Sequence, residues 1–241
     1  MSNKLSIFIP AYNAEKTVRS VIARIPAVLW NDIQAVYLID DGSGDDTSDV
    51  LQSIAEEHPG CIPVFHKVNK GYGKTARHGL ELCSGDGCAF AVCLHADGQY
   101  PPEMIAEGIG KMEGEHADIL QGSRIASGTA LSGGMPRYKY ISGKILTLLE
   151  NMVFGMRMTD YHSGFLIYRT EALQKIRFSS LSGSFDFDLE MIASARAARM
   201  KIIEMPIPTR YADEVSYLNP VHYGLRVLSV LVKYAAGRYS S

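Results

Sequence analysis

Short apolar runs alternate with amphipathic stretches through the first half of the chain. The apolar runs have the length of buried strands, and they cover residues 5–10, 35–41, 61–68 and 88–97. The stretches between them carry apolar residues at helical spacing and predict helices at residues 14–25, 47–58 and 73–83. Thr47 is the predicted N-cap of the second helix. Strands that alternate with helices in this way are typical of a parallel sheet covered by helices on both faces.

The second half of the chain continues this pattern less regularly. Apolar runs predict three more strands, at residues 117–125, 160–169 and 201–211. Helical spacing predicts helices at residues 140–156, 185–200 and 221–239, and the last of these is strongly apolar. Residues 127–139 are rich in glycine and serine, which predicts a mobile loop. The predicted fold is therefore a single α/β domain, with a mostly parallel central sheet flanked by helices.

The first four predicted strands all end in polar, loop-forming residues. These ends are residues 10–13, 40–43, 69–74 and 95–99. In open parallel sheets, ligands bind beyond the carboxyl ends of the strands. Four polar strand ends at one edge of a sheet therefore predict a binding site at that edge.

Composition and charge limit the kinds of ligand and the cellular location that we expect for this protein. The chain has 241 residues, of which 46% are hydrophobic and 21% charged, as is typical of a globular protein. Its formal net charge of −2 provides no overall basic field, so we expect no nucleic-acid partner. The four cysteines match no zinc spacing and are predicted to be buried, reduced thiols. No signal peptide or membrane span is predicted, so we expect a soluble or peripheral protein.

Seven motifs in a fixed order extend from Ile9 to about Pro208. They are IPAYN, DDGSGDDT, NKGYGK, HADGQYPP, GSR, HSGF and FDLE, the last followed by KIIEMPIP. This ordered set resembles glycosyltransferase family 2, in particular its dolichyl- and polyprenyl-phosphate sugar transferases. The resemblance implies a GT-A fold, a Rossmann-like domain that uses a nucleotide-sugar and a divalent metal ion. We expect this domain over residues 1–215 and a C-terminal amphipathic helical appendage over residues 216–241.

The chain departs from the family pattern at three places. Ala14 stands where the family usually has a glutamate after the Tyr-Asn pair, and Glu15 follows it. His95 replaces the first aspartate of the family's Asp-x-Asp metal motif. Near the end, Tyr211 takes the place of an arginine, and Ser216 is followed by tyrosine instead of lysine.

The donor side of the expected site combines a metal ion with a nucleotide. A hard divalent cation with oxygen ligands offsets the negative charge of a leaving diphosphate. Asp97 and Gln99 match the metal motif and are the predicted ligands of Mg²⁺ or Mn²⁺. His95 is predicted to lie beside the donor phosphates, either as a metal ligand or as a hydrogen-bond donor. The other predicted donor-binding residues are Pro10, Tyr12, Asn13, Asp40, Asp41, Gly73 and Lys74.

The residues on the acceptor side distinguish a transferase that uses a phosphate acceptor from one that uses a sugar hydroxyl. Arg124 and Arg137 match positions that hold the acceptor phosphate in the polyprenyl-phosphate branch, and arginine suits phosphate geometry. A phosphate monoester is largely a dianion at pH 7 and needs no general base, whereas a sugar hydroxyl needs one. Asp160, Asp188 and Glu190 are the candidate bases. The predicted catalytic residues are Asp97, Arg124, Arg137, Asp160 and Glu190.

We therefore expect a metal-dependent inverting transferase that moves a hexose from a GDP-mannose or UDP-glucose type donor to a polyprenyl or dolichyl phosphate. One alternative is transfer to a glycan hydroxyl in cell-surface polysaccharide assembly, and another is an inactive nucleotide-sugar-binding protein. The helices predicted at residues 140–156 and 221–239 could lie on a membrane surface or contact a membrane protein, or they could form core or homodimer contacts. We expect a cytoplasmic protein at the cytoplasmic face of the membrane.

Overall fold

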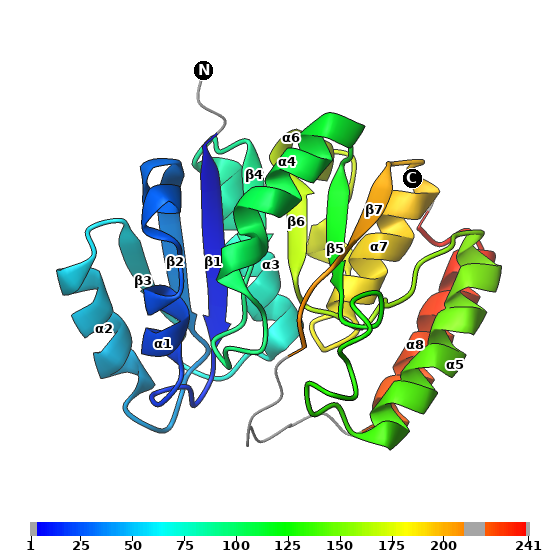
Figure 1. Ribbon diagram of the computed structural model, residues 1–241, viewed down its shortest axis with the longest axis horizontal. Helices are drawn as coiled ribbons and strands as arrows, with labels where there is room; N and C mark the ends of the chain where they lie inside the picture. The colour runs from blue at the N-terminus through cyan, green and yellow to red at the C-terminus, as the bar shows by residue number, and fades with distance from the viewer. Residues whose placement is uncertain (1–3, 210–219, 240–241) are drawn as a thin grey trace.

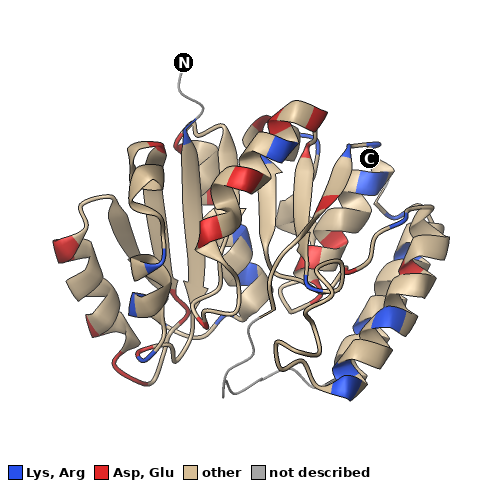
Figure 2. Ribbon diagram, viewed as in Figure 1, with Lys and Arg blue, Asp and Glu red and all other residues tan. Residues whose placement is uncertain are grey.

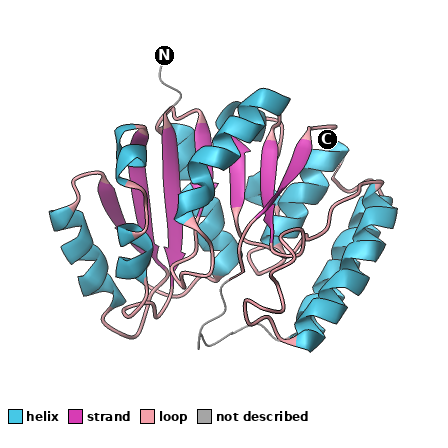
Figure 3. Cartoon of the chain, in the orientation of Figure 1, coloured by secondary structure: helices cyan, strands magenta, loops and turns pink. Residues whose placement is uncertain are grey.

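The computed structural model describes residues 4–209 and 220–239. These residues form one sheet between two layers of helices (Figures 1 and 3). The strands are β1 (Leu5–Ala11), β2 (Ile33–Asp40), β3 (Cys61–Phe65), β4 (Phe90–Cys93), β5 (Ile119–Ser123), β6 (Leu166–Arg169) and β7 (Ile202–Pro206). The α-helices are α1 (Val18–Ala23), α2 (Thr47–Glu57), α3 (Tyr72–Gly85), α4 (Ile105–Glu115), α5 (Arg137–Phe154), α6 (Thr170–Leu173), α7 (Phe187–Ala197) and α8 (Pro220–Ala235). Short 3₁₀ helices cover Ala27–Asn31, Pro102–Met104 and Phe178–Ser180.

The direction of β6 decides which residues reach the polar edge of the sheet. The strand order is β3-β2-β1-β4-β6-β5-β7, and all neighbours run parallel except β6, which is antiparallel to β4 and β5. The predicted single α/β domain with a mostly parallel sheet is therefore confirmed. Because β6 runs in the opposite direction, the residues that precede it lie at the edge where the other strands end.

Side chains that alternate along the strands pack into two hydrophobic clusters, one on each face of the sheet. Ile7 and Ile9 of β1 face the cluster covered by α1, α2 and α4, whereas Phe8 faces the cluster covered by α3, α7 and α8. Burial of each such side chain contributes about 1.5–3 kcal/mol to stability. A Cβ on Gly79 of α3 would lie 2.4 Å from the Phe8 ring, so α3 packs closely on β1. All four cysteines are buried free thiols, as predicted.

Several predicted strands extend beyond the observed ones. β3 ends at Phe65, β4 ends at Cys93 and β6 begins only at Leu166. The prediction that the strand at residues 88–97 continues to Asp97 is therefore wrong. Leu94 and Ala96 lie past the end of β4 but are still buried in a hydrophobic cluster, which is why the apolar pattern alone extends too far.

Helix boundaries also differ from the sequence pattern. Helices α4 and α6 lie where none is predicted, and α5 begins at Arg137, earlier than expected. Thr47 is the first residue of α2 and not its N-cap. Its hydroxyl accepts a hydrogen bond from the Ala14 N–H at 2.7 Å and donates one to Asp45. Thr47 therefore joins the loops that follow β1 and β2.

Helices α5 and α8 lie side by side at one end of the molecule (Figure 1). Helix α8 buries Val227, Val230 and Leu231 in the hydrophobic cluster that also includes α7. The predicted boundary between residues 215 and 216, together with Tyr211 and Ser216, lies outside the described residues. No helix in the described ranges is both long enough and apolar enough to span a bilayer.

Both helices also expose apolar side chains. These side chains recur at helical spacing, and we call them the apolar ridges of α5 and α8. The ridges consist of Tyr138, Ile141, Ile145, Leu148 and Met152 on α5 and Val221, Leu225, Leu228 and Val232 on α8. Exposed apolar surface of this extent is uncommon on a monomeric globular protein.

Candidate active site

A cavity of about 620 Å³ opens at the polar edge of the sheet. It brings together five residues predicted from the sequence: His95, Asp97, Gln99, Arg124 and Asp160. They come from the loops after β4 and β5 and from the loop before β6, which the antiparallel direction of β6 places at the same edge. Asp188, a candidate base, also lines the cavity.

Asp97 and Gln99 form the acidic corner of this cavity. The Gln99 N–H donates to Oδ1 of Asp97 at 3.0 Å, which folds residues 97–99 into a turn. A carboxylate and an amide carbonyl are oxygen donors of the kind that Mg²⁺ and Mn²⁺ prefer. Within the described residues, no group of three or more His, Cys, Asp or Glu side chains is arranged to hold a metal. The donor set therefore fits a cation that takes its other ligands from a diphosphate or from water.

His95 is fixed by aromatic neighbours beside this corner. Its Nε2 lies 3.2 Å from the Tyr72 hydroxyl, and its ring packs edge-on against Tyr100 with centroids 4.9 Å apart. A Cβ on Gly164 would lie 2.3 Å from the same nitrogen. Burial lowers the pKa of His95 and outweighs the opposing effect of the Asp97 carboxylate. We therefore expect a neutral imidazole whose Nε2 serves as a hydrogen-bonding group.

Tyr72 connects His95 to Asp188. The Tyr72 hydroxyl donates to Oδ2 of Asp188 at 2.7 Å, so the Nε2–H of His95 is the donor in the contact between His95 and Tyr72. Burial raises the pKa of Asp188 to about 7, although the hydrogen bond from Tyr72 acts against this rise. A carboxyl group with this pKa can exchange a proton near neutral pH.

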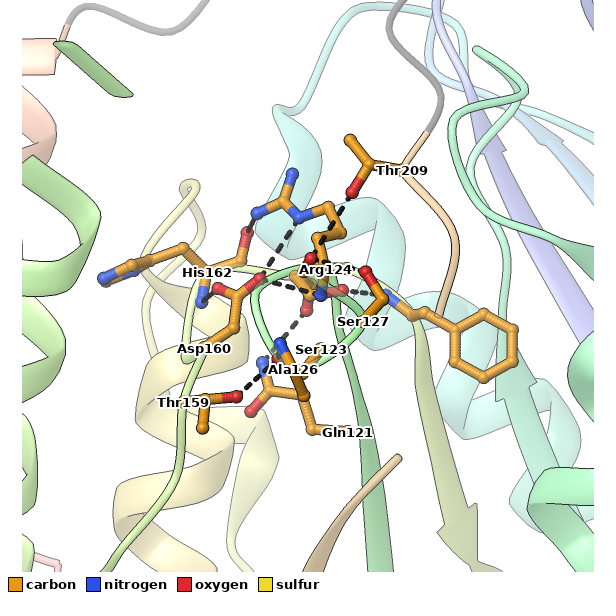
Figure 4. Close-up of polar contacts among 12 residues, drawn as sticks. Gln121, Ser123, Arg124, Ala126, Ser127, Thr159, Asp160, His162 and Thr209 are labelled. Atoms are coloured by element: carbon orange, nitrogen blue, oxygen red, sulfur yellow. Dashed lines mark hydrogen bonds and ion pairs between the residues drawn. The ribbon is translucent and has the colours of Figure 1, made fainter. Parts of the chain in front are cut away.

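Arg124 and Asp160 form a nearly buried ion pair at another wall of the cavity (Figure 4). Nε of Arg124 lies 3.2 Å from Oδ2 of Asp160, and Nη2 donates to the main-chain carbonyl of His162 at 2.8 Å. Burial would raise the pKa of Asp160, but the Arg124 guanidinium and His162 outweigh it, so the pKa lies below its usual value. Asp160 is therefore a weak base and serves to orient Arg124.

The loop that carries Asp160 is itself held by several polar contacts. Glu204 of β7 accepts hydrogen bonds from the N–H groups of Thr159 and Asp160 at 2.8 and 2.9 Å. The hydroxyls of Ser123 and Thr159 lie 2.6 Å apart, and Gln121 donates to a main-chain carbonyl in the same loop (Figure 4). These bonds fix the loop that carries Asp160, and with it the Arg124–Asp160 ion pair, to strands β5 and β7.

Two predicted catalytic residues do not reach the cavity. Arg137 is exposed at the first turn of α5, and Lys139 lines the cavity instead. Glu190 is buried on α7, where it accepts hydrogen bonds from Lys233 at 2.8 Å and Tyr239 at 2.7 Å. It lines a separate cavity between α7 and α8. Glu190 thus joins the two helices.

Asp41 holds the loop between β3 and α3. Its carboxylate accepts from the N–H groups of Lys70 and Gly71, each at 2.9 Å, and lies 2.9 Å from Nδ1 of His66. Gly71 has a φ of +90°, a backbone conformation that favours glycine. The Asp41 side chain therefore has a structural role, and its role in donor binding stays a prediction.

Asp40 and Asn13 make a similar set of contacts between β1 and β2. Asp40 accepts from the Ser43 N–H at 3.0 Å and from the Ser48 hydroxyl at 2.6 Å. The side-chain oxygen of Asn13 accepts from the Gly44 N–H at 2.9 Å. The loops after the first two strands are thus joined at the predicted donor side, outside the 620 Å³ cavity.

The remaining donor-side residues also lie outside that cavity. Tyr12, which follows Pro10 and the end of β1, is 41% exposed. Gly73 is a predicted donor-binding residue, but a Cβ there would lie 2.6 Å from the main chain of Gly183. The Lys74 side chain runs along the same glycine. The close approach that requires Gly73 is therefore to the protein's own backbone.

Several cavity residues carry no role in the sequence prediction. Tyr72, Tyr100 and His162 belong to the motifs NKGYGK, HADGQYPP and HSGF, so their motifs mark them even though the predictions leave them without a role. Lys139 and Tyr223 come from helices α5 and α8, and no motif marks them.

The fold defines the general class of the protein as GT-A. The structure resembles crystal structures of glucosyl-3-phosphoglycerate synthase from Mycobacterium tuberculosis, one of which contains Mn²⁺, uridine diphosphate and glucosyl-3-phosphoglycerate. The TM-score is 0.71, and the match covers 97% of this chain and 80% of that one at 16% sequence identity.

The sequence comparison then gives the family. The profile of glycosyl transferase family 2 matches residues 6–177, so the chain belongs to that family and is a glycosyltransferase. The UDP-N-acetylglucosamine--dolichyl-phosphate N-acetylglucosaminyltransferase of Methanococcus voltae is 27% identical over 88% of both chains. The polyprenol monophosphomannose synthase of Mycolicibacterium smegmatis is 25% identical over 83% of this chain and 75% of its own. The hexosyltransferase Agl6 of Haloferax volcanii, of low-salt glycan biosynthesis, is 30% identical over 97% of this chain and 54% of its own.

Proposed function

We propose that this enzyme transfers a hexose from a nucleoside-diphosphate sugar to a polyprenyl phosphate, with inversion at the anomeric carbon. The observation that carries this proposal is the Arg124–Asp160 pair in the cavity. Asp160 has a lowered pKa and orients a guanidinium, which suits the binding of an anion better than the deprotonation of a hydroxyl. The names of the relatives from Methanococcus voltae and Mycolicibacterium smegmatis agree with this acceptor class.

The apolar part of the cavity supports a lipid acceptor. Ile125, Met135, Leu146, Phe185 and Val221 line it alongside the polar groups. Leu146 and Val221 belong to α5 and α8, the helices that carry the apolar ridges. An isoprenoid chain leaving the cavity between these helices would keep its apolar surface away from water.

The transfer itself is a single displacement. An oxygen of the acceptor phosphate forms a bond to the anomeric carbon while the bond from that carbon to the diphosphate oxygen breaks, and the electron pair leaves with the diphosphate. Arg124 holds the acceptor, and Asp160 keeps the guanidinium in position. Asp97 and Gln99 would hold Mg²⁺ or Mn²⁺, which stabilises the charge on the leaving diphosphate.

We place the enzyme at the cytoplasmic face of a membrane, on which the apolar ridges of α5 and α8 would lie. Helix α5 also carries basic residues (Figure 2), among them Lys139 and Lys144, and these would attract anionic lipid head groups. A homodimer that buries the ridges is the alternative. Co-sedimentation with anionic vesicles supports the membrane arrangement, whereas a dimer in sedimentation equilibrium without lipid favours the alternative.

Transfer to a glycan hydroxyl remains the second candidate, because one observation favours it. Asp188 lines the cavity with a pKa of about 7, as a general base requires. Transfer that depends on the ionised form of Asp188 and is lost in Asp188→Asn would support a hydroxyl acceptor.

A radiolabel transfer assay with several nucleotide-sugars and undecaprenyl phosphate tests the proposal. We expect label in the lipid fraction, and label found only in water-soluble glycan contradicts the lipid acceptor. Arg124→Ala should lose transfer by about a hundredfold or more, while nucleotide-sugar binding is nearly unchanged. Arg19→Ala is the matched control, because Arg19 forms an exposed ion pair with Glu57.

A further inference from the structure

The side chains of Glu150, His162 and Tyr223, from three separate elements, form a polar network next to Arg124. His162, in the loop before β6, places Nε2 3.4 Å from Oε2 of Glu150 on α5. Its Nδ1 lies 3.0 Å from the hydroxyl of Tyr223 on α8. The His162 and Tyr223 rings meet edge-on, with an interplanar angle of 78°. Both ring nitrogens of His162 thus face a partner, while His162 and Tyr223 also line the cavity.

The burial of Glu150 indicates the charge on His162. Glu150 has 0% exposure, and neither carboxylate oxygen has a hydrogen-bond partner among the described residues. A buried carboxylate without a cation is strongly unfavourable, so the nearby His162 ring is expected to carry the compensating charge. The other charged groups that face His162 are Asp160, which favours the cation, and Arg124, which opposes it. Burial lowers the pKa of His162, but Glu150 and Asp160 outweigh it, so the pKa is raised.

A charged His162 determines which way the Tyr223 proton points. An imidazolium donates from both nitrogens, so Nδ1–H donates to the Tyr223 oxygen and Nε2–H points toward Glu150. The Tyr223 oxygen then accepts from His162, and its own proton must point elsewhere. Tyr223 lines the cavity that also contains Arg124, so the cavity is the direction open to this proton.

We propose that Tyr223 binds the acceptor, donating its hydroxyl proton to an anionic oxygen in the cavity, and that the Glu150–His162 pair sets this direction. The inference rests on the proposed phosphate acceptor. Loss of the His162 proton would leave Nδ1 free to accept from Tyr223, and the tyrosine would then no longer donate into the cavity. Glu150 and His162 are positioning residues in this arrangement, because they act through Tyr223.

The first test measures transfer to farnesyl phosphate, a short isoprenyl phosphate. Tyr223→Phe should raise the acceptor KM about tenfold, with kcat and the donor KM within about twofold of wild type. Tyr234→Phe is the control on the same helix, because Tyr234 packs edge-on against Phe154 and does not line the cavity. An acceptor KM in Tyr223→Phe equal to that of wild type overturns the proposal.

The second test follows pH. The acceptor KM of wild type should rise as the pH passes the raised pKa of His162, which NMR of the histidine ring locates directly. Glu150→Gln should move the His162 titration and the rise in KM to lower pH together. Tyr223→Phe should abolish the rise, and this variant decides the question even if Glu150→Gln does not fold. A rise in KM that persists in Tyr223→Phe contradicts the proposed role.

A binding measurement separates this inference from the proposed function. Calorimetry of farnesyl phosphate without donor reports acceptor binding whether or not sugar transfer follows. Binding that weakens in Tyr223→Phe, together with wild-type transfer only to hydroxyls, contradicts the proposed function but supports the Tyr223 contact. Equal binding by both proteins, together with normal lipid transfer, overturns the Tyr223 contact alone. If wild type neither binds farnesyl phosphate nor transfers to it, both proposals are wrong.

Discussion

At the scale of single residues, the site depends on close contacts that hold polar groups in fixed directions. Gly164 leaves room for the His95 ring, which also packs against Tyr100 and meets the Tyr72 hydroxyl. Asp97 follows only two positions after His95, so a shift of the imidazole would also move the carboxylate of the predicted metal ligand. The geometry of this corner therefore depends on the absence of a side chain at residue 164.

Gly164→Ala should disturb the site directly. The new Cβ would lie 2.3 Å from Nε2 and 2.5 Å from Cε1 of His95, and the aromatic neighbours leave the ring little room to move. We expect a loss of about 1–3 kcal/mol in the free energy of unfolding and a fall in transfer rate of between about tenfold and a hundredfold. Gly110→Ala is the control, since its Cβ would meet nothing within 4 Å in α4. Equal behaviour of the two variants would show that His95 can move freely.

Asp188 should make stability depend on pH. Its folded-state pKa of about 7 lies above the ordinary aspartate value of 3.8, because burial penalises the carboxylate. The stabilisation from the bound proton is therefore complete below about pH 4 and is lost as the pH rises through 7. Relative to wild type, Asp188→Asn should gain thermal stability at pH 8.5 that it lacks at pH 4.5. A difference in melting temperature that is the same at both pH values contradicts this explanation.

At the scale of elements, helices α7 and α8 are joined by charge as well as by apolar packing. Glu190 is 2% exposed and accepts from Lys233 and Tyr239, while Asp186 pairs with Arg226 at 3.2 Å. These contacts fix α8, the helix that delivers Tyr223 to the cavity. The position of the cavity wall thus depends on groups that are not part of it.

Lys233→Met should loosen this attachment. It leaves Glu190 buried without its cation, but Lys233 is half exposed, so we expect a cost of about 1–2 kcal/mol, below that of a fully buried pair. Chemical denaturation measures this cost, and kcat at saturating substrate should stay near wild type. Lys111→Met is the control, because its exposed pair with Glu115 is worth about 0.3–0.5 kcal/mol. An equal cost in both variants would contradict a structural role for the Glu190 pair.

The observed helices and strands show which parts of the fold and of the candidate site could be predicted from sequence patterns. Buried strands were predictable because runs such as those in β1 and β2 are apolar on both faces. A run that is apolar on both faces can pair in either direction, so the pattern could not predict that β6 is antiparallel to its neighbours. Helix α4 was missed because Gly108 interrupts its apolar face and because Gly110 and Gly114 lower its helix propensity further. Motif order pointed to Asp97 and Arg124, whereas Tyr223 reaches the cavity only through the packing of α8, which no local pattern records.

At the scale of the whole molecule, the donor and acceptor sides come from different parts of the sheet. The loops after β1, β2 and β3 form the predicted nucleotide side, and the loops around β5 and β6 together with α5 and α8 form the cavity. Asp97, in the loop after the central strand β4, lies between them. A metal ion at Asp97 would therefore lie where both substrates meet.

Metal binding should require the nucleotide. The described residues contain no cluster of three acidic, histidine or cysteine ligands, so the protein alone should bind Mn²⁺ weakly. We expect calorimetry to detect tight Mn²⁺ binding only with a nucleoside diphosphate present, and we expect a chelator to abolish transfer until Mn²⁺ or Mg²⁺ is returned. Asp97→Asn should weaken the joint binding. Tight Mn²⁺ binding without nucleotide would contradict this arrangement.

The place of β6 between β4 and β5 has a consequence during protein synthesis. Among the described strands, β5 pairs only with β6 and β7, and both of these come later in the chain. A nascent chain that stops at residue 165 would already contain β1 to β4 as neighbours, but β5 would have no strand to pair with. We therefore expect the half of the molecule that carries Arg124 to fold only after the strand that follows the HSGF motif has been synthesised, so that the predicted nucleotide side would form before the proposed acceptor side.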